Sequence, residues 1–191
     1  MHPVGPSHAV LVPIKDFDYA KARLADVLSP RERKALAQEL AAGVLEACAV
    51  FDLFVVCDAT AVATFAQDHG ATVIWTPEVG LNSAVRTGVD YLSQHGYESI
   101  TISHADLANP SGIATLPEHD GVIIVPDHRG DGTNVMRLPS SASFPFHYGA
   151  GSADQHARAA EEAGFAVLIL RDEALGHDVD DAHDLARLRG H

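Results

Sequence analysis

Short apolar runs alternate with segments of helical pattern along the whole chain. Each run is rich in Val, Ile, Leu or Ala, as in strands that are buried inside a sheet. These runs lie at residues 9–14, 53–57, 72–76, 99–103, 121–125, 135–138 and 167–170. The segments between them repeat apolar residues at intervals of three or four, which is typical of helices with one buried face. Helices are predicted from residue 30 onward and at 62–69, 82–95, 153–163 and 181–189.

Strand–helix alternation of this kind predicts an α/β fold, in which helices cover both faces of a mostly parallel sheet. No internal repeat, low-complexity segment or linker divides the sequence, so we expect one domain over residues 1–191. Three irregular segments remain, at residues 15–28, 105–120 and 139–151. Long loops in a compact domain are usually functional or disordered. Because ligands of open α/β sheets bind beyond the carboxyl ends of the strands, polar clusters that follow apolar runs are expected to converge there.

The clearest helix start lies at residues 29–32. Ser29 can cap the helix, Pro30 suits its first position, and Glu32 completes a capping box. The buried stripe of this helix is predicted at Leu36, Leu40, Val44 and Leu45.

Composition and charge narrow the functional classes. The chain has a formal net charge of −13 and is 47% hydrophobic, as in a globular protein that nucleic acids and anionic membranes would repel. No apolar stretch approaches the roughly 20 residues of a membrane span, and residues 1–5 lack the charged and apolar regions of a signal peptide. Cys48 and Cys57 lie in apolar surroundings and are expected to be buried thiols. We therefore expect a cytoplasmic enzyme without nucleic-acid or membrane partners.

The first candidate cluster is cationic and follows the first predicted strand. Lys15, Lys21 and Arg23 lie close together in an otherwise acidic chain, separated by apolar and aromatic residues. Such cations can neutralise the phosphates of a nucleotide, although an ordinary surface charge cluster is an equally good interpretation. No glycine-rich loop ending in Gly-Lys-Ser is present, so this cluster is not a P-loop.

Carboxylates form the second candidate cluster. Asp106 comes just after the fourth predicted strand, and Asp178 and Asp180 point the same way if their backbone is extended. Neighbouring carboxylates repel unless a cation or a proton lies between them, and Mg²⁺ prefers one or two carboxylates with substrate phosphates. We therefore predict a magnesium site, with a turn or cap role for Asp106 as the alternative. Asp181 and Asp184 are interpreted instead as caps of the last helix.

Small and polar residues mark two further segments. Residues 130–134 and 149–152 combine glycines with Asp, Thr, Asn and Ser, a composition that lets a ligand approach the backbone and lets turn amides hold an anion. Ser152 also suits the N-cap of the following helix. Another helix is predicted to begin after Gly80. The default interpretation is that Asn82 or the serine after it caps this helix, and the alternative interpretation is that they contact a nucleoside. Ordinary turn chemistry is the competing interpretation for each segment.

In chain order these clusters resemble one family, the 2-phospho-L-lactate and phosphoenolpyruvate guanylyltransferases that make the precursor of the deazaflavin coenzyme F-420. The resemblance runs over nearly the whole chain in collinear order. Its pieces are Val12-Pro13-Ile14-Lys15, Ala20-Lys21-Ala22-Arg23-Leu24, Leu28-Ser29-Pro30-Arg31-Glu32-Arg33, Gly80-Leu81-Asn82, Ala105-Asp106-Leu107, Val125-Pro126-Asp127, Gly132-Thr133-Asn134, Phe144-Pro145-Phe146, Gly149-Ala150-Gly151-Ser152 and Asp178-Val179-Asp180. Each piece alone is unspecific, whereas the ordered set is fairly specific.

The resemblance implies a nucleotide-diphospho-sugar transferase architecture, which is a single-domain three-layer sandwich with a mixed, mainly parallel sheet. It implies GTP as donor, phosphoenolpyruvate or 2-phospho-L-lactate as acceptor and Mg²⁺ as cofactor, and it leaves a homodimer open. By position it implies nucleotide contacts at Lys15, Lys21, Arg23, Gly80 and Asn82, acid-substrate contacts at Thr133, Gly149 and Ser152, metal ligands at Asp106, Asp178 and Asp180, and catalytic roles for Lys21, Arg23 and Asp106.

The expected reaction is a direct displacement, in which a phosphate oxygen of the acceptor attacks the α-phosphorus of GTP and pyrophosphate leaves. The acceptor phosphate is already ionised at neutral pH, so catalysis is positioning and charge neutralisation rather than proton transfer. Two alternatives stay open: a nucleotidyltransferase for a sugar phosphate or another cofactor precursor, and a GTP-binding regulatory module without turnover. The second rests on departures from the family pattern, such as Ala108 where the family usually has proline.

Overall fold

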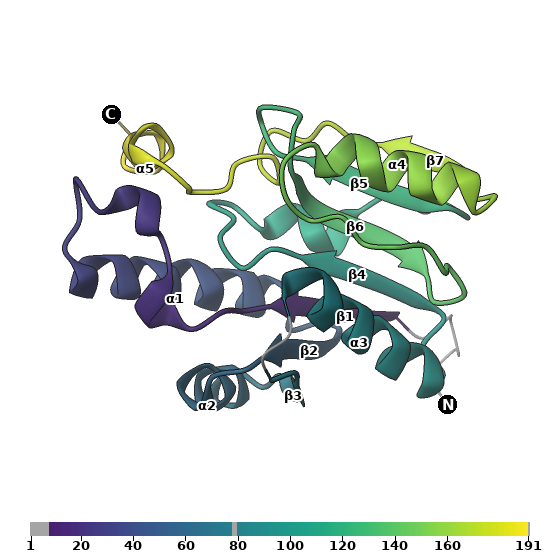
Figure 1. Cartoon of the computed structure of the whole chain (residues 1–191), viewed down its shortest axis with the longest axis horizontal. Coiled ribbons are helices and arrows are strands. Elements are labelled where there is room, and N and C mark those ends of the chain that lie inside the picture. The colour runs from purple at the N-terminus through teal and green to yellow at the C-terminus, as the bar shows by residue number, and fades with distance from the viewer. Residues whose placement is uncertain (1–7, 78–79, 191) are drawn as a thin grey trace.

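The computed structural model describes residues 8–77 and 80–190. Its strands are β1 (His8–Pro13), β2 (Asp52–Cys57), β3 (Thr72–Trp75), β4 (Ser99–Ser103), β5 (Val122–Pro126), β6 (Thr133–Pro139) and β7 (Val167–Ile169). They form one 7-stranded sheet in the order β3-β2-β1-β4-β6-β5-β7 (Figure 1). Every predicted strand is confirmed, with small differences at the ends.

The sheet is mixed because β6 runs against both of its neighbours. β6 pairs antiparallel with β4, where Met136 lies opposite Ile102, and with β5, where the same Met136 lies opposite Ile124. The pairs β1–β2, β1–β4, β2–β3 and β5–β7 are all parallel. The carboxyl ends of the four strands from β3 to β4 therefore share one edge of the sheet, which confirms a mixed, mainly parallel architecture.

Helices cover both faces of the sheet. They are α1 (Pro30–Ala47), α2 (Thr60–Asp68), α3 (Leu81–Gln94), α4 (Ser152–Glu162) and α5 (Ala182–Leu188). Residues of α1 and α2 pack with Val10 and Val12 on one face, whereas residues of α3 and α4 pack with Ala9 and Leu11 on the other. This division follows from the alternation of side chains along a strand, and it produces a three-layer sandwich (Figure 1).

The last helix, α5, packs away from the two main clusters. A separate apolar cluster joins it to α1 and to the loop after β1, through Leu24, Leu28, Leu36, Leu40, Val179 and Leu185. This cluster holds the segment before α5 against the loop after β1. Two segments from opposite ends of the sequence are thereby fixed beside one another.

Two capping predictions are confirmed. The hydroxyl of Ser29 accepts a hydrogen bond from the Glu32 amide, and the Glu32 carboxylate accepts one from the Ser29 amide. Asp181 and Asp184 form the equivalent box at the start of α5. Because each box satisfies amides that would otherwise lack a partner, it defines where the helix begins.

Two other capping predictions are wrong. Gly80, rather than Asn82 or Ser83, is the N-cap of α3, and Gly151, rather than Ser152, is the N-cap of α4. The backbone of Gly151 is left-handed, with φ at 69°, a conformation that favours glycine. The side chains of Asn82 and Ser152 are therefore available for the bonds to other segments described below.

Two of the segments predicted to be irregular contain short 3₁₀ helices. These are η1 (Phe17–Tyr19) and η2 (Ala22–Leu24) after β1, and η3 (Ser111–Thr115) after β4. Cys48 and Cys57 are buried free thiols, as predicted. Residues 78–79, just before Gly80, lie outside the described part of the chain, as do residues 1–5. Of the helices described, none combines the length and apolar character needed to cross a membrane.

Candidate active site

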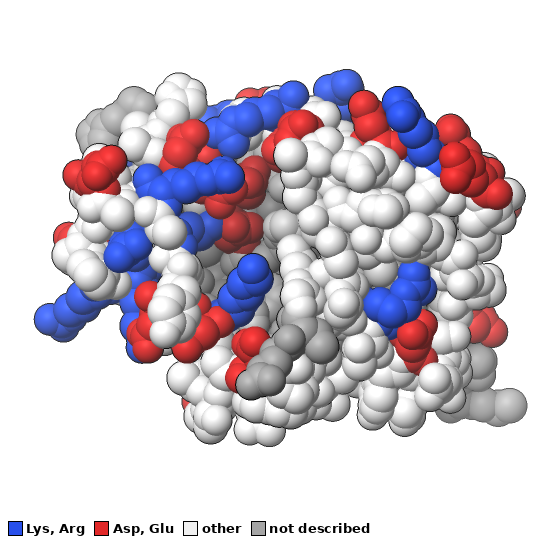
Figure 2. Space-filling model, viewed as in Figure 1, with Lys and Arg blue, Asp and Glu red and all other residues white. Residues whose placement is uncertain are grey.

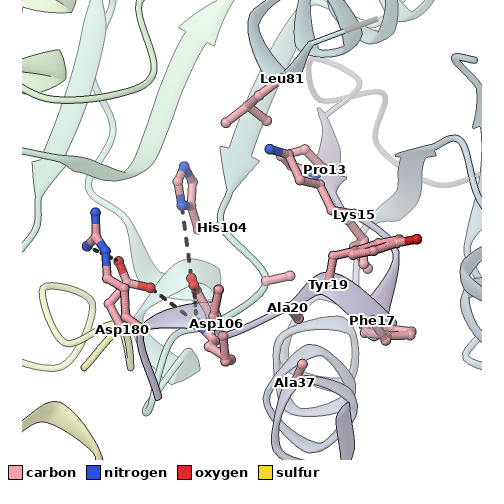
Figure 3. Close-up of a pocket in the computed structure, with 15 residues that line it drawn as sticks. Pro13, Lys15, Phe17, Tyr19, Ala20, Ala37, Leu81, His104, Asp106 and Asp180 are labelled. Carbon is pink, nitrogen blue, oxygen red and sulfur yellow. Dashed lines mark hydrogen bonds and ion pairs between the residues drawn. The ribbon is translucent and has the colours of Figure 1, made fainter. Parts of the chain in front are cut away.

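A cavity of about 420 Å³ opens where β1 and β4 end. Acidic and basic side chains surround a hollow on this face of the molecule (Figure 2). Within the cavity, Asp106 and Asp180 lie on one side and Lys15 and Tyr19 lie across from them (Figure 3). The ionisable side chains that line it are Lys15, Tyr19, Lys21, Arg23, His104, Asp106 and Asp180. The predicted convergence of the cationic and acidic clusters at this edge of the sheet is confirmed.

Lys21 lies at the centre of this charged group. Its Nζ is 2.5 Å from Oδ2 of Asp106 and 3.3 Å from Oδ1 of Asp180, and 6% of its side chain is exposed. Its backbone is left-handed (φ 54°, ψ 40°), and no other non-glycine residue in the described ranges has a positive φ. This conformation costs a non-glycine residue about 1–2 kcal/mol, and strain of this kind is concentrated at functional sites.

The acidic segments, far apart in the sequence, lie side by side. The amide of Val179 donates a hydrogen bond to the carbonyl of Asp106 at 3.1 Å. An isolated antiparallel bridge joins Leu107 to Asp178. Asp178 itself is buried, whereas Asp180 is partly exposed at the cavity. The backbone thus brings together the three carboxylates that were predicted to meet.

Mutual attraction and repulsion set the protonation of this group. Burial disfavours the charged forms of Lys21 and Asp106, but their attraction outweighs burial. The pKa of the Lys21 ammonium is therefore raised, and the pKa of the Asp106 carboxyl is lowered. His104 also lowers the pKa of Asp106. For Asp178, burial and then the negative charges of Asp106 and Asp180 raise the pKa. The raised pKa of Asp178 reflects repulsion among neighbouring carboxylates, and a bound cation would relieve that repulsion.

The carboxylates suit a hard cation by their chemistry. Oδ1 of Asp106 is buried and has no hydrogen-bond partner among the residues that the structure describes, so one oxygen that could bind a metal is left over beside the ion pair with Lys21. Within residues 8–77 and 80–190, no three His, Cys, Asp or Glu side chains are already grouped as metal ligands. The Lys21 ammonium instead lies between Asp106 and Asp180. This donor set fits Mg²⁺, which takes its remaining ligands from substrate and water.

A second cavity, of about 500 Å³, adjoins the first and shares Lys15, Tyr19 and Leu81 with it. Gly80 lines this second cavity, beside the ends of β2 and β3. Tyr19 is 83% exposed, and it belongs to the walls of both cavities. Of the predicted nucleotide contacts, the three cations line the first cavity, and Lys15 and Gly80 line the second.

Asn82, the remaining predicted nucleotide contact, bonds to the protein instead. Its Oδ1 accepts a hydrogen bond from the amide of Tyr148 at 2.7 Å, and its Nδ2 donates to the carbonyl of Tyr148 at 3.4 Å. This reciprocal pair ties the first turn of α3 to the segment that precedes α4. The contacts therefore indicate that Asn82 holds this segment in place.

The residues predicted to hold the acid substrate lie outside the lining of the first cavity. Thr133 and Ser152 are 2% and 1% exposed, and the Ser152 hydroxyl lies 3.2 Å from Oγ1 of Thr133. Gly149 is exposed, with φ at 140°. None of these three lines the cavity at Lys21. Thr133 is connected to the acidic group through the next residue of β6, since Asn134 donates to Oδ1 of Asp178 at 3.2 Å.

His156 is a member of this polar group that sequence reasoning missed. It is 0% exposed, and its Nδ1 lies 3.0 Å from Oγ1 of Thr133. Its Nε2 accepts a hydrogen bond from the amide of His147 at 2.8 Å. His156 follows Ser152 by four residues, so both lie on one face of α4. That spacing is visible in the sequence and could have indicated His156.

His104 and Tyr148 connect the cavity with this buried group. Nδ1 of His104 lies 3.9 Å from Oδ1 of Asp106, and its ring centroid lies 5.2 Å from that of Tyr148. The Tyr148 ring is in turn 4.8 Å from the ring of His156. Burial raises the pKa of the Tyr148 hydroxyl. Nε2 of His104 and the Tyr148 hydroxyl are buried without a hydrogen-bond partner among the described residues, which is unusual in a folded protein.

Solved structures share the fold. A protein described as a nucleotide-diphospho-sugar transferase from Desulfovibrio desulfuricans G20 matches with a TM-score of 0.79 at 19% identity, over 95% of this chain and 85% of that chain. A 4-diphosphocytidyl-2C-methyl-D-erythritol synthase from Anaerococcus prevotii matches with a TM-score of 0.60 at 8% identity, over 96% and 95%. These likenesses confirm the nucleotide-diphospho-sugar transferase architecture.

Sequence relatives are closer. A sequence model of the family described as "Guanylyl transferase CofC like" matches residues 8–191. A phosphoenolpyruvate guanylyltransferase of Sphaerobacter thermophilus is 33% identical over 95% of this chain and 92% of its own length. One of Rubrobacter xylanophilus is 32% identical over 93% and 91%. Because these matches span nearly the whole chain, it belongs to the guanylyl transferase CofC-like family of nucleotidyltransferases.

Proposed function

We propose that this chain transfers GMP from GTP to phosphoenolpyruvate and releases pyrophosphate, in the synthesis of coenzyme F-420. 2-Phospho-L-lactate is the alternative acceptor. The observation that carries the proposal is the meeting of Lys21 with Asp106 and Asp180 in one cavity at the edge of the sheet. The cations of such a site can bind phosphates, and its carboxylates can bind a metal ion. The names of the two relatives support the choice of acceptor.

In this proposal the triphosphate of GTP lies against the three cations of the first cavity. The raised pKa of Lys21 keeps its side chain an ammonium. Arg23 is 75% exposed and its guanidinium is 3.5 Å from Asp180, so it can turn to a phosphate without leaving a buried charge behind. The guanosine occupies the adjoining cavity beside Gly80. Apart from the chain neighbours of Gly80, no atom of the described residues lies within 4 Å of the place that a Cβ would take there.

The reaction is a displacement at phosphorus. A phosphate oxygen of the acceptor forms a bond to the α-phosphorus of GTP, the bond from that phosphorus to the bridging oxygen breaks, and pyrophosphate leaves with the electron pair. The attacking oxygen is already ionised at neutral pH, so no residue needs to take a proton. Lys21 and Arg23 offset the charge that collects on the departing pyrophosphate.

We infer that Asp106, Asp178 and Asp180 hold Mg²⁺ during this reaction. The unpaired Oδ1 of Asp106 and the repulsion that raises the pKa of Asp178 support this assignment. When bound, Mg²⁺ supplies charge neutralisation to the phosphate oxygens. Lys21, relieved of neutralising the carboxylates, can then direct its ammonium to the triphosphate.

The test is turnover by an Asp106→Asn variant, measured as pyrophosphate release from GTP and phosphoenolpyruvate. We expect at least about a 100-fold loss of kcat, the usual effect of removing one group that stabilises transition-state charge, with the far-UV circular dichroism unchanged. Asp68→Asn, at the exposed end of α2, is the matched control and should keep full activity. Normal turnover by Asp106→Asn or Asp106→Ala contradicts the proposal.

A panel of nucleotides and acceptors separates the proposal from its two alternatives. Pyrophosphate release with a sugar phosphate, but not with phosphoenolpyruvate or 2-phospho-L-lactate, would indicate a different nucleotidyltransferase. Tight GTP binding without pyrophosphate from any acceptor would indicate a regulatory module. Turnover that is specific for GTP and a small phosphorylated acid supports the proposal.

A further inference from the structure

A fully buried histidine joins two elements behind the cavity. Nδ1 of His156 lies 3.0 Å from Oγ1 of Thr133 on β6, and its Nε2 accepts a hydrogen bond from the amide of His147 at 2.8 Å. The hydroxyl of Ser152, at the start of α4, lies 3.2 Å from the same Thr133 oxygen. Both ring nitrogens of His156 therefore have defined partners, and one partner belongs to the Thr133–Ser152 hydroxyl pair.

The position of the ring proton follows from these partners. A backbone N–H can only donate, so Nε2 of His156 must be the unprotonated nitrogen. Burial, with smaller contributions from His147 and His104, lowers the pKa of His156 to about 4, so the ring is neutral at pH 7. A neutral imidazole carries one proton. That proton must be on Nδ1, which therefore donates to Thr133.

The hydroxyl pair is consequently left with a spare proton. One lone pair of Thr133 Oγ1 accepts from His156. If Ser152 donates to Thr133, the Thr133 proton has no acceptor among the described residues; if Thr133 donates to Ser152, the Ser152 proton has none. A buried donor without an acceptor is unfavourable, and a negatively charged oxygen satisfies such a donor best.

The hydroxyl pair lies close to the proposed reaction site. Asn134, the residue after Thr133, donates to the Asp178 carboxylate at 3.2 Å. Ser152 directly follows the turn at residues 149–151, in which Gly149 and Ala150 are exposed and the Gly151 amide donates to Oδ1 of Asp131 at 3.0 Å. Aromatic rings link the pair to the first cavity, since the Tyr148 ring centroid lies 4.8 Å from that of His156 and 5.2 Å from that of His104, which lines the cavity.

We propose that His156 is a positioning residue that makes the Thr133–Ser152 pair donate a hydrogen bond to an anionic oxygen of the acid substrate. This inference rests on the proposed function, because it concerns the site of that substrate. With the proton on the other ring nitrogen, the pair could satisfy itself and would select no anion. The carboxylate and the phosphate of the acceptor both carry such an oxygen, and the analogue test below identifies which one receives the bond.

Two substitutions separate the two bonds of His156. Gln places its amide near the position of Nε2, so His156→Gln can accept from His147 but cannot donate to Thr133. Asn places its amide near Nδ1, so His156→Asn can donate to Thr133 but does not reach His147. We expect His156→Gln to raise the KM for phosphoenolpyruvate about tenfold, the effect of one lost hydrogen bond to a charged group. The KM for GTP should stay within about twofold, because the triphosphate site is untouched.

His156→Asn is the matched control, and its KM for phosphoenolpyruvate should stay within about threefold of wild type because the donor to Thr133 is kept. Equal values for the two variants, or equal rises in both KM values, would overturn the inference, since either indicates a purely structural role. An acceptor analogue that lacks the carboxylate, tested on wild type and His156→Gln, identifies which oxygen receives the bond.

Imidazole ¹⁵N shifts of the wild-type chain at pH 7 provide a second test that does not depend on how the variants fold. We expect a proton on Nδ1 and none on Nε2 of His156, and the opposite tautomer would overturn the inference. Turnover by the wild-type protein distinguishes failure of the inference about His156 from failure of the proposed function. An inactive wild type rejects the proposed function and the inference with it, whereas an active wild type without the Gln–Asn difference rejects the inference alone.

Discussion

Nζ of Lys21 lies 2.5 Å from Oδ2 of Asp106, so a lysine ammonium stands among the carboxylates proposed to bind a divalent ion. The same Nζ lies 3.3 Å from Asp180. The protein therefore neutralises its acidic group with its own cation. A metal ion and a triphosphate, bound together, can exchange partners with this pair without leaving any of the charges unpaired.

Lys21→Met removes this charge and keeps a side chain of similar length. Without metal we expect a loss of about 2–4 kcal/mol in the free energy of unfolding, because the carboxylates lose their buried counterion. Added MgCl₂ should then raise the Tm of the variant more than that of wild type. Thermal unfolding with and without MgCl₂ measures both effects.

Lys34→Met is the control for this experiment. Lys34 pairs with Asp18 at 2.6 Å, but the two side chains are 39% and 62% exposed. We expect less than about 1 kcal/mol of destabilisation from an exposed pair, and no added response to MgCl₂. An equal response of wild type and Lys21→Met would argue against a metal site at these carboxylates.

His156 should make the protein sensitive to acid. Its pKa is about 4 in the folded chain and near 6.5 when unfolded. Between these values the unfolded state binds more protons, so the stability linked to this group is complete above pH 6.5 and is lost as the pH falls toward 4. Urea unfolding of wild type should lose up to about 3 kcal/mol more than His156→Asn over this interval. A stability difference between the two proteins that does not change with pH would contradict this expectation.

Substitution of Asn82 tests whether this residue contacts the nucleotide or only holds the segment before α4. Asn82→Ala removes both hydrogen bonds to Tyr148 and should destabilise the protein by about 1–2 kcal/mol. We expect faster amide exchange in the segment before α4 and a higher KM for the acceptor, with little change for GTP. Asn82→Asp keeps an acceptor for the Tyr148 amide and should behave more like wild type. A rise confined to the KM for GTP would instead support the nucleotide contact predicted from the sequence.

Two helical glycines should respond oppositely to alanine. A Cβ on Gly88 of α3 would lie 2.7 Å from Cδ2 of Leu11 and 2.9 Å from Cγ1 of Val56. Gly88→Ala should therefore destabilise the protein by about 1–3 kcal/mol, despite the better helix propensity of alanine. At Gly43 of α1, no atom of the described residues lies within 4 Å of the same position, apart from its chain neighbours and the backbone of its own helix. Gly43→Ala should therefore stabilise the protein by roughly 0.5–1 kcal/mol. Chemical denaturation of the two variants provides the comparison, and a stabilised Gly88→Ala would show that α3 can shift away from the sheet.

Much of the fold could be predicted because its signals are local. Apolar runs such as β4 (Ser99–Ser103) and capping boxes such as Ser29–Glu32 depend on residues that are neighbours in the sequence. The meeting of Lys21 with Asp106 could also be predicted, because both follow strands whose carboxyl ends share one edge of a parallel sheet. Local periodicity and the rules of strand connection were sufficient for these features.

The remaining features depended on tertiary contacts. Asn82 pairs with the backbone of Tyr148, and Thr133 bonds to both Ser152 and His156, which are partners that the sequence did not indicate. A polar side chain bonds to whichever donor or acceptor packing brings within reach, and that partner can come from any distance along the chain. By itself the sequence therefore determined the sheet, its helices and the edge where charges gather, because these follow from hydrophobic patterning and chain connection. Only the tertiary structure decided which polar atoms pair with one another behind that edge, because those bonds depend on distances of a few tenths of an ångström.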